Sequence, residues 1–237
     1  MKTLRLSTVG AVCAIAAVAC FVSGSAVMGS NGVEVLIPET GDPGREWIAD
    51  VDAAGGAFFI GGWLIILMGY LGMVALLGFY DVLRHSGPWL LLAPILGIAG
   101  LVLVTLSHLI PIAMGYELVP AYVEADPAGQ ATLAVTADTL AATALVTNSA
   151  GNFLGWGIAT PLFAIAILVT RALPRWIGWL GLLVGLLAGW LGLAGPASGV
   201  LEGVASLGFI GFFVFLLSMG IAMLRRTASQ AVSQTTT

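Results

Sequence analysis

Six long apolar runs constrain this chain more than any other feature of its sequence. They cover approximately residues 8–28, 55–80, 89–115, 149–170, 176–195 and 204–224. A helix needs about 20 apolar residues to cross the roughly 30 Å hydrocarbon layer of a bilayer, and each run meets that length. The runs are apolar all round, without the alternation that barrel strands require. The pattern predicts an all-α membrane protein, a six-transmembrane-helix bundle forming one domain over residues 1–226.

The composition agrees with that class and excludes several others. Charged residues make up 8% of the 237 residues and hydrophobic residues 59%, whereas roughly a quarter of an ordinary soluble domain is charged. Such a chain is neither a soluble enzyme, nor a disordered segment, nor a nucleic-acid binder. It contains no Gly-x-x-x-x-Gly-Lys-[Ser/Thr] loop for a nucleotide. We expect no nucleotide or nucleic-acid partner and no cofactor; the bilayer itself is the first partner.

The positions of the charges predict the orientation of the bundle. In a six-span topology, seven of the eight basic residues fall on one side, which the positive-inside rule assigns to the cytoplasm. Arg45 is the exception, and Asp81 is the single acid on the basic side. Both termini are therefore predicted to be cytoplasmic. The basic residues on that side are Lys2, Arg5, Arg84, Arg171, Arg175, Arg225 and Arg226.

The first apolar run has two interpretations. Lys2 and Arg5 precede it, and Gly24-Ser25-Ala26 follows as in a cleaved secretory signal peptide. However, the run continues to Met28, which is long for a signal core. The sequence favours a retained first span and leaves cleavage open.

A further helix is predicted on the outer side, over residues 127–147. Asp126-Pro127 is typical of a helix start. Threonines recur from there at helical spacing, beside a stripe of leucine and alanine. This amphipathic helix either packs over the outer helix ends with its threonines toward water, or forms a lid whose hydroxyls line an outward cavity. The threonines are Thr132, Thr136, Thr139, Thr143 and Thr147.

Two other segments carry simpler expectations. Gly181, Gly185 and Gly189 repeat every four residues in the fifth run, a spacing that lets helix backbones approach closely. We interpret this stripe as packing within the chain, with a dimer face as the alternative. Residues 227–237 are rich in Ser, Thr and Gln and are predicted to be a disordered cytoplasmic tail.

Polar residues near the outer ends of the spans form the candidate site. A polar residue within a span is a functional hypothesis by default, and if the helix ends converge, these side chains ring one outward-facing pocket. No His-Glu-x-x-His or similar metal-ligand spacing is present, and no nucleophile with an adjacent base can be assigned. The candidates are Asp52, His108, Glu117, Asn148, Asn152 and Glu202.

One segment resembles a known family. Leu173-Pro174-Arg175-Trp176-Ile177-Gly178 is similar to the loop that precedes a glycine-rich fifth span in an uncharacterised bacterial family of six-span membrane proteins. The resemblance extends loosely over residues 8–226. It implies a bacterial plasma (inner) membrane, and because that family has no characterised activity, it assigns no catalytic residue.

Three functional classes follow from these observations. The first is a non-enzymatic accessory or assembly partner of another membrane complex, favoured because conspicuous chemistry is missing. The second is a small transporter, or an outward-facing binder of an apolar or lipid-like ligand. The third, least favoured, is an intramembrane enzyme that uses an outer-side site of histidine and carboxylates.

Overall fold

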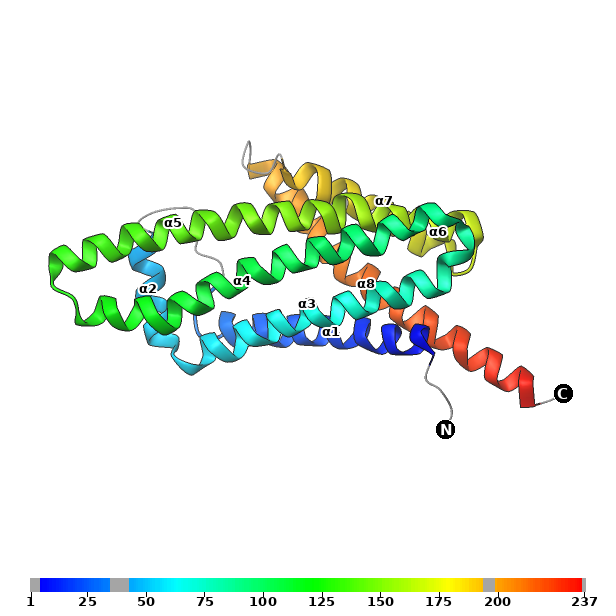
Figure 1. Ribbon diagram of the computed structural model, residues 1–237, viewed down its shortest axis with the longest axis horizontal. Helices are drawn as coiled ribbons and strands as arrows, with labels where there is room; N and C mark the ends of the chain where they lie inside the picture. The colour runs from blue at the N-terminus through cyan, green and yellow to red at the C-terminus, as the bar shows by residue number, and fades with distance from the viewer. Residues whose placement is uncertain (1–4, 35–42, 194–198, 236–237) are drawn as a thin grey trace. The chain divides into compact units, whose positions relative to one another are not determined.

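A computed structural model describes residues 5–34, 43–193 and 199–235 of the chain (Figure 1). Of residues 43, 199–202 and 227–235 it describes the backbone alone. Every regular element in these ranges is helical and none is a strand, which confirms the all-α prediction. The α-helices are α1 Leu6–Gly29, α2 Pro43–Ala54, α3 Gly56–Leu83, α4 Leu92–Glu124, α5 Pro127–Asn152, α6 Thr160–Thr170, α7 Arg175–Val184 and α8 Gly199–Thr235.

Four short elements complete the chain in the described ranges. Two are 3₁₀ turns between α3 and α4, namely η1 Arg84–Ser86 and η2 Pro88–Leu91. The other two are π-helical segments, in which hydrogen bonds close over five residues instead of four. They are η3 Phe153–Ala159, which joins α5 to α6, and η4 Gly185–Leu191, which follows α7.

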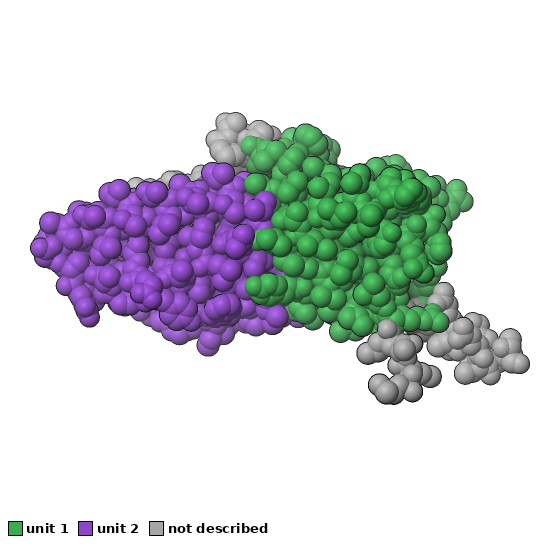
Figure 2. Space-filling view, in the orientation of Figure 1, with its two compact units in different colours: residues 1–18, 70–102, 150–237 green, residues 19–69, 103–149 purple. Residues whose placement is uncertain are grey.

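The helices group into two compact units, where the sequence predicted one domain over 1–226 (Figure 2). Several helices contribute to both units, because the division falls within α1, α3, α4 and α5. Each unit is described by itself below. Unit 1 comprises Met1–Val18, Tyr70–Val102 and Ala150–Thr237; unit 2 comprises Ala19–Gly69 and Leu103–Ser149.

The helices have the length and surface of membrane spans. Apolar side chains that a soluble protein would bury are open on them: Leu67, Val102 and Leu183 are 44%, 42% and 51% exposed. Lipid is the solvent that suits such a surface. Five helical stretches of the described chain are long and apolar enough to cross a membrane: Leu6–Gly29, Gly56–Ser86, Pro88–Glu124, Pro127–Thr170 and Gly203–Arg226.

Three stretches differ from the sequence-based expectation. The outer helix over 127–147 and the fourth span over 149–170 are one continuous helix of 44 residues, since no proline interrupts it between Pro127 and Pro161. The fifth span, expected over 176–195, is a shorter helix, Arg175–Leu191, followed by two more helical residues; residues 194–195 lie outside the described ranges. The tail predicted to be disordered continues α8 as helix to Thr235.

Helix α2 packs into unit 2 through one apolar face. Its face of Trp47, Ile48 and Val51 is buried, and the Trp47 indole donates a hydrogen bond of 3.1 Å to the carbonyl oxygen of Glu34. The Trp47 ring meets that of Phe58 edge-on, with centroids 5.6 Å apart. A polar segment thus acquires a helix because one of its faces can bury an aromatic anchor.

Unit 1 is held together by close backbone contacts between helices. A Cβ placed on Gly10 of α1 would lie 2.6 Å from the Cα of Gly78 on α3, so only glycine permits this crossing. Gly220 of α8 packs similarly on α1, where its Cβ would lie 2.9 Å from the carbonyl oxygen of Ala11. These contacts place the ends of α1, α3 and α8 close to one another.

The glycine stripe of the fifth run packs inside unit 1, which confirms the intramolecular interpretation. Gly181 faces Phe215 of α8, while Gly185 and Gly189 face the η3–α6 helix at Pro161 and Gly157. All three glycines are buried. The two π-helical segments therefore pack against each other.

Candidate functional site

His108 of the predicted polar pocket is bound to the backbone of its own helix. Its Nδ1 lies 2.7 Å from the carbonyl oxygen of Val104, one turn earlier in α4. A carbonyl oxygen can only accept, so Nδ1 must carry the proton. No hydrogen bond to Nε2 comes from the part of the chain that the structure describes.

Ser107 links His108 to a second candidate, Asn148 of α5. The fully buried Ser107 Oγ lies 2.7 Å from the Val104 oxygen, 3.2 Å from His108 Nδ1 and 3.4 Å from the Asn148 amide. Its single proton goes to the shortest acceptor, the Val104 carbonyl. The Asn148 contact is then best made by the amide nitrogen donating to Oγ. The three side chains form one polar cluster in unit 2.

Ser107 and His108 are adjacent but do not form a nucleophile and its base. A base must accept the proton of the nucleophile, and the Nδ1 that faces Ser107 already donates its own proton to Val104. Ser107 is also closed to substrate, with 0% exposure. The geometry supports a role in helix packing, as interhelical hydrogen bonds provide in membranes.

The other two candidates in unit 2 do not join this cluster. Asp52 on α2 and Glu117 on α4 are exposed, and no described residue forms a hydrogen bond or ion pair with either. Asn152, at the end of α5, is half-buried and belongs to unit 1. Glu202 lies in α8 at a position whose side chain the structure does not describe. Of the four predicted residues that the structure describes in unit 2, it brings His108 and Asn148 together through Ser107.

The residues that the structure describes contain no group of three or more His, Cys, Asp or Glu side chains arranged to hold a metal ion. The donor set that a zinc site requires is therefore not assembled within those ranges. Ser107, which the candidate list omitted, is the residue that connects the cluster. Its position directly before His108 was the available signal.

The threonine stripe of α5 points outward from unit 2. Each of the five hydroxyls donates to the carbonyl oxygen four residues earlier, over 2.7 to 3.1 Å. The opposite side is the packed one, where Ala134, Ala137 and Ala144 are buried. Thr139, Thr143 and Thr147 border a shallow groove of about 710 Å³ along α5, and the choice between a water-facing helix and a lid over an outward cavity stays a prediction.

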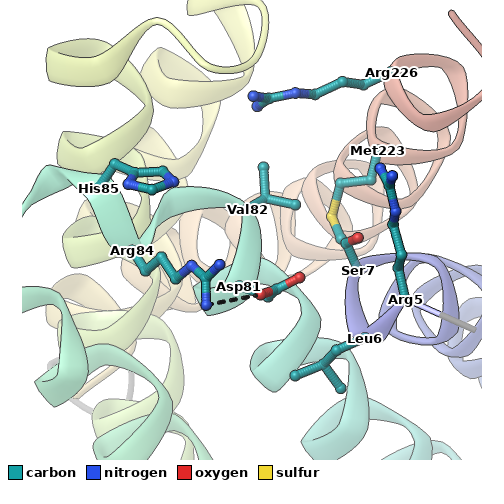
Figure 3. Close-up of a pocket in the computed structure, with 9 residues that line it drawn as sticks. All are labelled: Arg5, Leu6, Ser7, Asp81, Val82, Arg84, His85, Met223 and Arg226. Atoms are coloured by element: carbon teal, nitrogen blue, oxygen red, sulfur yellow. Dashed lines mark ion pairs between the residues drawn. The ribbon is translucent and has the colours of Figure 1, made fainter. Parts of the chain in front are cut away.

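A second concave site lies in unit 1 and was not among the predicted residues. It is a cavity of about 530 Å³ at the ends of α1, α3 and α8 (Figure 3). Three of its lining side chains are arginines from distant parts of the sequence, and a single carboxylate lines it. The lining residues are Arg5, Leu6, Ser7, Asp81, Val82, Arg84, His85, Met223 and Arg226.

Two contacts position the arginines of this cavity. Arg84 Nη1 lies 3.6 Å from Asp81 Oδ1, one turn earlier. Arg226 Nη1 donates a hydrogen bond of 3.1 Å to the carbonyl oxygen of Ala172, in the connection between α6 and α7. Sequence analysis placed these arginines on one side of the membrane, but their convergence depends on the glycine crossings of α1.

Comparison with protein-family models, curated proteins and solved structures finds no match to this chain. The resemblance to a bacterial six-span family remains a prediction, and function is argued below from the chain's own residues.

Proposed function

We propose that this chain is a six-span protein of a bacterial plasma membrane that acts as a non-enzymatic accessory or assembly partner of a membrane complex. The observation that carries the proposal is the outward side of α5. We call it the α5 face; it is made of small, exposed side chains, and Asp138 borders the groove beside it. Its residues are Ala131, Thr132, Val135, Thr136, Thr139, Ala142, Thr143 and Val146.

The α5 face has the chemistry of a helix-packing surface. Small residues let a second helix approach closely, and van der Waals contact drives such association in membranes. Val135 and Val146 are 65% and 70% exposed, so apolar area is open at both ends of the face. The groove beside Thr139 and Thr143 provides a concave seat for the ridge of another helix.

The length of the helix argues that protein covers part of this face. At 1.5 Å per residue, the 44-residue helix is about 66 Å long, roughly twice the hydrocarbon thickness. In the six-span topology its first half projects beyond the outer leaflet. The apolar side chains of Val135 and Val146 would meet water there if the face were uncovered, and a helix of a partner membrane protein is the occupant that we propose.

The rival enzyme receives less support from the geometry. The one histidine at the predicted pocket donates to a backbone carbonyl, and its serine neighbour is buried. His108 Nδ1 is taken by a backbone carbonyl and Ser107 is closed to substrate, so the pair does not present a nucleophile beside its base.

Site-specific cross-linking in native membranes tests the proposal. A photoreactive benzoylphenylalanine replaces Thr139 on the α5 face, and as a control replaces Leu183 on α7, which is 51% exposed. We expect a discrete adduct with a different protein from position 139 and none from position 183. The substitution Ala142→Trp should abolish the adduct, whereas Leu186→Trp on η4 should leave it.

Two outcomes overturn the accessory role. An adduct whose mass is twice that of this chain would show that the α5 face binds a second copy. The absence of any protein adduct at position 139, with the reagent shown to react with lipid, would show that lipid covers the face.

A further inference from the structure

The cavity of unit 1 gathers positive charge from three separate helices. Arg5 immediately precedes α1, Arg84 follows α3 in η1, and Arg226 lies in α8. Asp81 is the single acid among the described lining residues, beside three arginines. Figure 3 shows these side chains arranged around the open space, with the Arg84–Asp81 ion pair on one side of it.

The cavity is built by packing and not by the chance meeting of flexible side chains. Gly10 and Gly78 hold α1 on α3, and Gly220 holds α8 on α1. Arg5, Arg84 and Arg226 each lie five or six residues beyond one of these crossings, where the helices separate. Arg226 is further fixed by its bond to the Ala172 carbonyl oxygen.

We propose that this cavity binds a phosphate-bearing anion. Guanidinium groups match the geometry of phosphate oxygens and bind them through paired hydrogen bonds. The volume of about 530 Å³ lies within the range of small-ligand sites, roughly 300 to 1,000 Å³. The predicted topology places the cavity on the cytoplasmic side, where basic pockets between spanning helices recognise anionic head groups.

Two sources present this chemistry: the head group of an anionic phospholipid and free inorganic phosphate. The cavity lies at the ends of spanning helices and is lined partly by Leu6, Val82 and Met223. An anion that brings an acyl chain gains contact with such apolar side chains, whereas free phosphate does not. The proposal is independent of the α5 face, which belongs to unit 2.

Binding to the full-length protein in nanodiscs of phosphatidylcholine tests the site. The probes are short-chain phosphatidic acid, inorganic phosphate and, as a control, short-chain phosphatidylcholine. We expect saturable binding of phosphatidic acid, weakened about fivefold by Arg84→Gln and by Arg226→Gln. Arg175→Gln, which removes the same charge at an exposed position outside the cavity, should leave the affinity unchanged.

A gain of affinity provides a second test that misfolding cannot imitate. Asp81→Asn removes the one carboxylate of the described lining, so binding of the anion should tighten about fivefold. Preferred binding of phosphatidic acid identifies the lipid head group, and equal binding of inorganic phosphate identifies the free anion. The proposal is overturned if neither probe saturates, or if Arg175→Gln weakens binding as much as Arg84→Gln while Asp81→Asn has no effect.

Discussion

The indole nitrogen of Trp190 donates a hydrogen bond of 3.1 Å to the carbonyl oxygen of Gly157, 33 residues earlier in the chain. Gly157 lies in the π-helical segment η3, so this bond ties a side chain of η4 to the backbone of η3. The same pair of segments is joined by an edge-on contact of Trp190 with Phe153, with centroids 5.0 Å apart.

The first prediction concerns the hydrogen bond from the Trp190 indole to the Gly157 carbonyl oxygen. Trp190→Phe keeps an aromatic ring against Phe153 but removes the donor, so unfolding in detergent should require about 1 kcal/mol less free energy. Trp179→Phe is the control, since Trp179 is 64% exposed and makes no hydrogen bond with a described residue. Equal losses from the two substitutions would show that the bond does not contribute.

The crossing of α1 and α3 provides a second prediction. Gly78→Ala places a Cβ 2.6 Å from the Cα of Gly10, which is backbone that cannot rotate away. We expect destabilisation of about 1 to 3 kcal/mol. Gly56→Ala, which meets nothing within 4 Å, should be nearly neutral in the same thermal unfolding measurement. If Gly78→Ala is equally neutral, the two helices do not pack at this point.

The protonation of His108 can be measured directly. Its bond to the Val104 carbonyl requires the Nδ1–H form, so NMR of ¹⁵N-labelled histidine should show a protonated Nδ1 and an unprotonated Nε2 for this ring. The second histidine signal is assigned by its loss in His85→Gln. An Nε2–H ring at position 108 would contradict the geometry and restore Nδ1 as a base facing Ser107.

The predicted topology is tested with single cysteines. After Cys13 and Cys20 are replaced by alanine, a cysteine at Thr132 should react with a membrane-impermeant maleimide in intact cells. A cysteine at His85 should react only after the membrane is opened, because the positive-inside rule places it in the cytoplasm. The reverse pattern would invert the topology while leaving the fold unchanged.

Features of this fold that depend on neighbouring residues could be predicted from the sequence. Helical spans follow from uninterrupted apolar runs, and the inward packing of the Gly181 stripe follows from its spacing. The join between residues 127–147 and 149–170 was missed, because a polar helix and an apolar helix look like separate elements even when no residue breaks them. Helix α2 was hidden in a polar segment whose buried face is only Trp47, Ile48 and Val51.

The sites depended on contacts between distant residues. His108 and Asn148 were candidates only because both lie near the outer ends of predicted spans. Their link through Ser107 forms because α4 and α5 pack with Ser107 opposite Asn148. The basic cavity shows the same limit. The sequence assigns its arginines to one side of the membrane, and only the close approach at Gly10 and Gly78 turns that assignment into a cavity.

The internal hydrogen bonds of the α5 threonines have a consequence for reversibility. Since every one of the five hydroxyl protons is already committed to the helix's own backbone, covering the α5 face leaves no donor without a partner. Uncovering it exposes none either. When a complex formed there separates, no side-chain hydrogen bond of these threonines has to be broken. Its lifetime would therefore depend on how closely the small side chains pack against the partner. Adding or removing a single methyl group at this face would be enough to change that lifetime.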